Sequence, residues 1–128
     1  MPMTVEEFIA AEAAKPFTWG ETDCASTASR WVEAVTGVNP VRQFRRVYTN
    51  EAEARAWLAE PGGIAVAMNR VMRAAGFAKT RTAQCGDVGL VMRDHRLCVS
   101  IFTGSLWFSR DASGLIGSNA FWKAWSIR

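Results

Sequence analysis

Cys24 is the residue whose type and position could most directly do chemistry. It follows Thr22 and Asp23, either of which can cap a helix that begins at Cys24. The unpaired backbone N–H groups and the dipole at a helix start favour a thiolate over a thiol. A cysteine in such a position is a candidate nucleophile at neutral pH. The alternative is a small, buried, apolar cysteine, which is what most free cysteines are.

His95 is the only histidine, and therefore the only imidazole that could act as a general base for Cys24. It lies far along the chain from Cys24, in a predicted turn between Asp94 and Arg96. A Cys–His pair would thus need a contact in space, not in sequence. The alternative is a solvent-exposed histidine in a charged turn.

The counts of cysteine and histidine restrict other chemistry. Three cysteines, an odd number, exclude a complete disulfide framework, and one histidine excludes zinc sites with two or more. Cys24, Cys85 and Cys98 also lack the Cys-x-x-Cys spacing of zinc loops. We therefore expect no metal and no cofactor. A bridge between Cys85 and Cys98 across neighbouring strands is conceivable, but a reducing compartment argues against it.

The first half of the chain is predicted to be helical. Thr4 and Glu7 form a capping box for a helix over residues 5–14, which Pro16 ends. Apolar periodicity predicts further helices over residues 24–35, 51–58 and 64–75, while residues 38–48 are predicted to be a loop.

The second half changes to short, β-rich segments. Strands are predicted over residues 87–92, 97–102 and 106–109, with turns at 93–96 and 103–105. Gly114 and Gly117 predict a loop, and residues 121–127 a last strand. Helices followed by antiparallel strands define an α+β fold, with the N-terminal helices packed on a small sheet. With no repeat and no linker, residues 1–128 are predicted to form a single domain.

Composition and charge exclude several classes of protein. The chain has 128 residues, 49% of them hydrophobic, and a net charge of +3, which is typical of one globular domain. No signal peptide and no membrane-spanning segment is predicted, so we expect the cytoplasm of the producing cell. The basic residues between positions 42 and 46 favour a solvated loop, and no nucleic-acid partner is expected.

Three segments together resemble a known family. Phe17-Thr-Trp-Gly-Glu-Thr-Asp-Cys24, the Gly86-Asp87 strand start and Val99-Ser-Ile-Phe-Thr-Gly104 resemble the NlpC-type cell-wall peptidases, which are small papain-like enzymes. The resemblance covers residues 17–108 and is nearest to short proteins associated with phage tails and prophages.

This resemblance implies a papain-like fold and assigns roles to individual residues. Cys24 matches the family's nucleophile and Asp23 the aspartate that precedes it. Trp19 and Gly20, in the loop before Cys24, are expected to line the substrate cleft together with Cys98.

The chain departs from the family at the general base. Cys98 occupies the position of the family's histidine, and Phe108 falls near its third polar residue. Neither is a suitable proton acceptor, and loss of a general base typically lowers a rate by about 10²–10⁴-fold. His95 is three positions out of register, and an odd shift moves a side chain to the other face of a strand.

Two hypotheses follow. In the first, the protein keeps a papain-like hydrolase fold with an incomplete site and serves in a phage tail or its assembly, in the virion or the producing cell. In the second, it is an active thiol peptidase or amidase that cleaves peptidoglycan stem peptides, with Cys24 as nucleophile and His95 as base.

Overall fold

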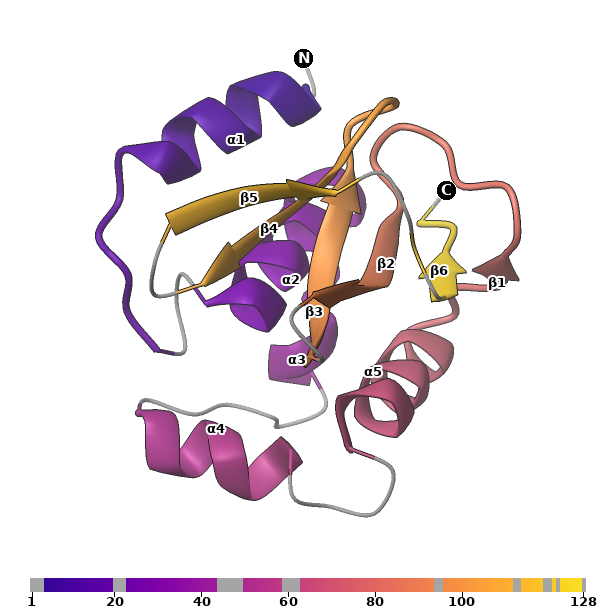
Figure 1. The fold of residues 1–128 in the computed structure, drawn as a ribbon. Coiled ribbons are helices and arrows are strands. Elements are labelled where there is room, and N and C mark those ends of the chain that lie inside the picture. Colours follow the sequence, from indigo (N-terminus) through magenta and orange to yellow (C-terminus); the bar gives the residue numbers. More distant parts are fainter. Residues whose placement is uncertain are drawn as a thin grey trace.

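The chain folds as helices followed by one antiparallel sheet. The computed structural model describes residues 4–19, 23–43, 50–58, 63–93, 96–111, 114–118, 121 and 123–127. The helices come first in the chain: α1 (Val5–Ala13), α2 (Cys24–Thr36), α3 (Pro40–Gln43), α4 (Glu51–Leu58) and α5 (Gly63–Ala74). The strands follow: β1 (Lys79–Thr80), β2 (Val88–Arg93), β3 (Arg96–Phe102), β4 (Trp107–Asp111), β5 (Gly114–Ser118) and β6 (Lys123–Trp125). Figure 1 shows this arrangement, which confirms the predicted α+β class.

The strands form a single sheet in the order β1-β6-β2-β3-β4-β5. β2 and β3 pair along their full length, with Val91 opposite Cys98 and Leu90 opposite Val99. β4 pairs with β3 only at the two positions Ile101↔Phe108 and Phe102↔Trp107, and continues beside β5. Within the described residues, the first half of β3 therefore pairs with β2 alone. The other edge of this half of β3 has no partner strand among the described residues.

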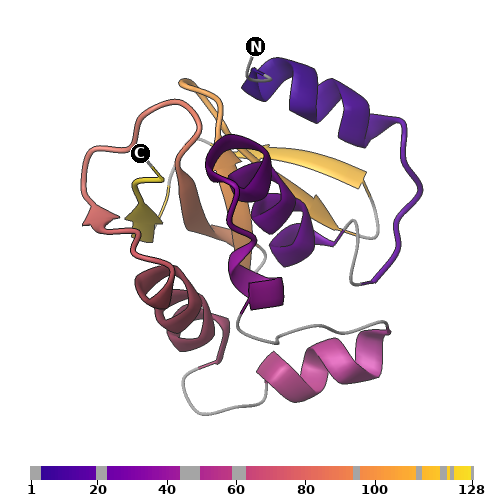
Figure 2. The same cartoon turned by 180° about the vertical axis from the view of Figure 1, so that it is seen from behind.

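The main core lies between α2 and one face of the sheet. Figures 1 and 2, taken from opposite sides, show α2 against the sheet, behind the strands in one view and in front of them in the other. Trp31 and Val32 of α2 are buried against Leu90, Val99 and Ile101 of the central strands. A smaller apolar cluster of Val91, Trp107 and Ala124 is separate from this core.

The starts of α1 and α2 follow the predicted capping. The Thr4 hydroxyl accepts a hydrogen bond from the Glu7 backbone N–H, and the Glu7 carboxylate accepts one from the Thr4 backbone, as in a capping box. At α2 the cap is Asp23, whose carboxylate accepts a hydrogen bond of 3.1 Å from the Ser26 backbone N–H. Gly37 ends α2 in the left-handed conformation, with φ of 83°.

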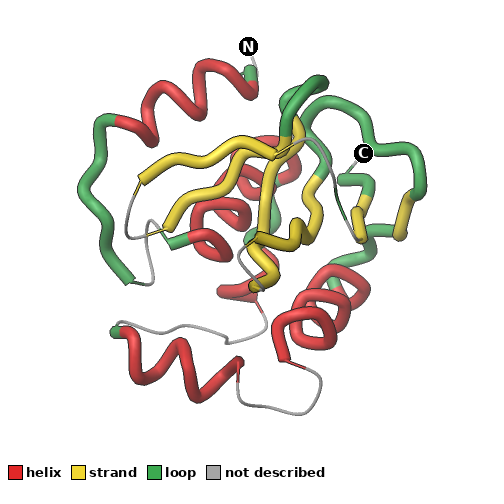
Figure 3. The backbone as a smooth tube through the Cα atoms, in the orientation of Figure 1, coloured by secondary structure: helices red, strands yellow, loops and turns green. Residues whose placement is uncertain are grey.

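Four short elements differ from the sequence predictions. The expected loop at 38–48 contains α3, where the Asn39 side chain accepts a hydrogen bond from the Arg42 backbone N–H. Gly114 and Gly117 lie in β5 and not in a loop, because β4 offers this segment a partner strand. Figure 3 draws these two strands side by side in yellow. β1 was not predicted, and the last strand is confined to β6. These elements form through contacts with distant segments, and each is too short to show hydrophobic periodicity in the sequence.

A buried charge network attaches α1 to the rest of the domain. The Glu12 side chain is only 1% exposed and receives two hydrogen bonds of 2.6 Å from Arg30 on α2. Lys15 donates a further one. Arg110 of β4 donates to the backbone carbonyls of Glu12 and Lys15. Burial alone would raise the pKa of Glu12, but Arg30 and Lys15 outweigh it and lower the pKa below its ordinary value.

Candidate functional site

Cys24 is the first residue of α2, as the sequence predicted. Asp23 immediately before it is buried, and its carboxylate serves as the helix cap through the bond to Ser26. Cys24 is partly buried and packs against the main core. The Asp-Cys pair therefore has a structural explanation in the capping of α2, whatever chemistry the thiol carries out.

The environment of the Cys24 thiol does not favour a thiolate. The pKa of Cys24 is raised to about 12, chiefly by burial, with smaller contributions from the neighbouring Cys98 and Asp23. The backbone N–H groups of Val99 and Ala25 face the Cys24 sulfur and act in the opposite direction, but they do not compensate. The expectation that the helix start would lower this pKa is thus wrong, because loss of solvation outweighs the helix dipole. At neutral pH Cys24 carries a thiol.

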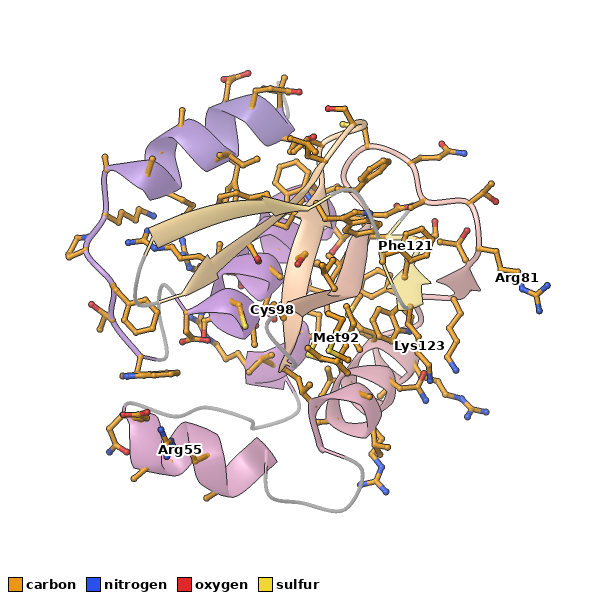
Figure 4. The ribbon with its side chains drawn as sticks, viewed as in Figure 1. Arg55, Arg81, Met92, Cys98, Phe121 and Lys123 are labelled. Atoms are coloured by element: carbon orange, nitrogen blue, oxygen red, sulfur yellow. The ribbon has the colours of Figure 1, made fainter. Side chains whose placement is uncertain are left out.

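Cys98 lies beside Cys24 and carries a second free thiol. It lies on β3 directly before Val99, whose N–H faces the Cys24 sulfur, and it is partly exposed. Figure 4 labels Cys98 on β3 beside the first turn of α2. The structure therefore brings Asp23, Cys24 and Cys98 together. A thiol in this place offers no efficient proton acceptor.

The remaining predicted site residues divide into two groups. Trp19 is partly buried against the main core, and its ring makes an edge-to-face contact with Phe17 at a centroid distance of 5.0 Å. Trp19 thus belongs to the segment that leads into α2. His95 and Gly20 lie outside the described residues, so their roles as base and as cleft residue stay predictions.

The Gly86-Asp87 pair forms a structural corner that fixes α2 to the start of β2. The Trp31 indole N–H donates a 2.7 Å hydrogen bond to the Gly86 carbonyl, and Gly86 adopts a φ of 95°. Asp87 is fully buried, and its carboxylate accepts a hydrogen bond from the Gln84 backbone N–H. This corner orients the helix that carries Cys24 and contributes no group to the thiol itself.

Cys85 lies away from the other two cysteines. It is exposed, and its thiol donates to the carbonyl of Thr103, just beyond the end of β3. Cys98 lies near the start of the same strand, and at about 3.3 Å per residue this separation is about 16 Å. Cys85 and Cys98 are therefore too far apart to be bridged in this fold. The described residues contain no group of three or more His, Cys, Asp or Glu side chains placed to hold a metal ion.

The sequence did not predict that the backbone N–H of Val99 would face the Cys24 sulfur. Its side chain is apolar and buried, and only its backbone N–H faces the Cys24 sulfur. Because every residue except proline has a backbone N–H, the residue type gives no indication of such a contact. Only the position of Val99 directly after Cys98, in a predicted strand, hinted that this peptide would lie near Cys24.

The fold and site thus define an α+β protein with a cysteine at the start of its central helix, next to a second cysteine on a central strand. The family model described as Domain of unknown function (DUF6950) matches residues 2–127, and the chain belongs to this family. No curated protein and no solved structure matches the chain. Among the described residues, no helix has the length and apolar character needed to cross a bilayer.

Proposed function

We propose that this protein is a papain-like domain of the NlpC type whose hydrolase site has lost its general base, and that it serves as a structural or assembly component of a phage or prophage tail. The observation that carries the proposal is the pair of Cys24 and Cys98. A hydrolase of this type needs an imidazole beside its nucleophile, and this place is taken by a second thiol.

The arrangement of the elements supports the papain-like part of the proposal. A helix with cysteine as its first residue packs against an antiparallel sheet, and the strand beside that cysteine carries the residue aligned with the family's base. The Gly86-Asp87 corner directly before β2 also agrees with the resemblance.

The protonated state of Cys24 supports loss of peptidase activity. Nucleophilic attack on an amide needs a thiolate, and burial with a raised pKa leaves little thiolate at neutral pH. Two backbone N–H groups, of Ala25 and Val99, point at the sulfur itself. The site therefore resembles a cysteine packed at a helix start, with its sulfur held by backbone N–H groups, more than one arranged for attack on an external carbonyl.

A hydrolysis assay tests the loss of activity. The full chain and its Cys24→Ala variant are incubated with purified peptidoglycan and with a soluble stem peptide, and released peptides are quantified by mass spectrometry. We expect equal, background release from both proteins. Release by the natural protein that disappears in Cys24→Ala and in His95→Ala would contradict the proposal and establish the active peptidase.

An association assay tests the structural role. The protein is analysed by light scattering alone and after mixing with phage tail proteins. We expect a stable assembly with itself or with a tail protein. A monomer under both conditions would overturn the tail role and leave the inactivity of the site as a separate result.

A further inference from the structure

The feature that carries a further inference is the contact between the start of α2 and the open edge of β3. The peptide group that joins Cys98 to Val99 points its N–H at the Cys24 sulfur. β4 pairs with β3 only from Ile101 onward, so that no described strand separates Cys24 from this edge. The two cysteines come from segments far apart in sequence and meet at one place.

Covalent geometry limits how far apart the two side chains can be. The nitrogen of Val99 is two bonds from the Cα of Cys98, which is about 2.4 Å. A hydrogen bond to that nitrogen therefore holds the Cys24 sulfur within a few ångströms of the Cys98 Cα and Cβ. Disulfides form between cysteines whose Cα atoms are about 4.4–6.8 Å apart, so closing the bond requires the start of α2 and β3 to meet within this range.

We infer that Cys24 and Cys98 form a reversible disulfide that ties the first turn of α2 to β3 when the protein meets an oxidising environment. Both cysteines are free thiols in this structure, and both retain part of their surface exposed. A virion component passes from a reducing cytoplasm to an oxidising exterior, which supplies the change in conditions. The inference itself does not depend on the tail role.

The oxidant is a small-molecule disulfide, represented by oxidised glutathione. The Cys98 thiolate attacks one of its sulfur atoms, forms a mixed disulfide and releases one glutathione thiolate. Cys24 then loses its proton to solvent, and its sulfur attacks the Cys98 sulfur and releases the second glutathione. Two protein thiols lose two electrons in total, and one oxidised glutathione becomes two reduced glutathione molecules, which take up the two protons.

Cys85 provides an internal control for the selectivity of this reaction. It is the exposed cysteine, so a small disulfide reaches it readily. Because its thiol lies against Thr103 at the far end of β3, it has no second cysteine to displace the glutathione. Cys85 should therefore stop at a glutathione adduct, whereas Cys24 and Cys98 proceed to an internal bond.

The test is a redox titration of the folded full chain. The protein is equilibrated in glutathione buffers of increasing oxidising strength, blocked with an alkylating reagent and digested, and the linked peptides are identified by mass spectrometry. We expect a Cys24–Cys98 peptide that appears with oxidation and disappears on return to a reducing buffer. The Tm of the oxidised protein should exceed that of the reduced protein, since the bond restricts the unfolded chain.

Single variants separate the bond from general oxidation. Cys24→Ser and Cys98→Ser should each abolish the linked peptide and the rise in Tm, while Cys85→Ser should retain both. The inference is overturned if Cys85 becomes fully glutathionylated in the natural protein while no Cys24–Cys98 peptide forms. It is equally overturned if the bond found joins Cys85 to either of the other cysteines.

Discussion

At the scale of single residues, two physical effects act in opposite directions on Cys24. The start of a helix favours a negative charge, typically by about 0.3–1 kcal/mol at exposed positions. Removal of a thiolate from water has the opposite sign and is larger here, so the pKa of Cys24 rises to about 12. The neighbouring Cys98 adds to this rise instead of providing a base.

The raised pKa of Cys24 predicts a loss of stability at high pH. Above its ordinary value of 9.0 the unfolded thiol loses its proton, while the folded thiol keeps it up to about pH 12. The unfolded state then binds fewer protons, so the free energy of unfolding falls as pH rises, by up to about 1.4 kcal/mol per pH unit from this group. Urea denaturation at several pH values should show a steeper fall for the natural protein than for Cys24→Ala. An equal fall in the free energy of unfolding with pH in both proteins would contradict the raised pKa of Cys24.

The replacement Cys98→His tests whether position 98 is the place of the missing base. An imidazolium next to a thiol favours the thiolate. We therefore expect alkylation of Cys24 at neutral pH to become about tenfold faster or more, equivalent to at least one unit of pKa. Cys98→Ser is the matched control and should leave the alkylation rate of Cys24 within about a factor of three of the natural rate. An unchanged rate in Cys98→His would show that this side chain does not reach the Cys24 sulfur.

At the scale of secondary-structure elements, α1 depends on the buried carboxylate of Glu12. Replacement of Glu12 by Gln removes the carboxylate that pairs with Arg30 and Lys15, and breaking a buried pair typically costs about 3–5 kcal/mol. We expect the lower end of this range, because the Arg30 side chain is 23% exposed. Glu51→Gln, which removes a surface pair with Arg55, is the control and should change stability by less than about 1 kcal/mol.

The lowered pKa of Glu12 also predicts that the folded protein loses stability at acidic pH. The folded pKa of Glu12 is lowered, so its contribution is present above its ordinary value of 4.5 and is lost as pH falls through the folded value. Stability of the natural protein should therefore decrease below about pH 4.5 more than that of Glu12→Gln. Equal decreases in both proteins, measured by thermal denaturation, would contradict the role of the network.

The pairing of β2 with its neighbours depends on the absence of a side chain at Gly89. A Cβ there would lie 2.6 Å from the Trp107 ring and 2.8 Å from the Lys123 carbonyl. Since Trp107 is buried, we expect Gly89→Ala to destabilise the protein by about 3 kcal/mol. Gly76→Ala has open space and only a positive φ to overcome, at about 1–2 kcal/mol. Similar urea midpoints for the two variants would show that the ring moves aside without penalty.

At the scale of the whole molecule, local signals predicted the longer elements well. The capping residues Thr4, Glu7 and Asp23 gave the starts of α1 and α2, and apolar periodicity placed α4 and α5 to within one residue. α3, β1 and β5 were missed, since each is short and exists through contacts with distant segments. Gly117 illustrates the reason: its type indicates a turn, but its pairing with Phe108 makes it part of a strand.

The candidate site was predictable in its location but not in its chemistry. Helix capping and the family resemblance together pointed to Asp23, Cys24 and Cys98, which the structure brings together. The protonation state of Cys24 was not predictable, because it depends on burial against β3 and on the Val99 peptide. Neither the burial nor a backbone contact can be read from residue types.

The central claim is that Cys24 carries a protonated, unactivated thiol in the folded protein. The most direct test measures its alkylation by iodoacetamide in the native chain between about pH 6 and pH 11, with site-resolved mass spectrometry and the exposed Cys85 as internal reference. We predict that Cys24 reacts more slowly than Cys85 throughout and that its rate is still rising at the highest pH. A Cys24 rate that exceeds that of Cys85 and levels off below about pH 8 would contradict the claim.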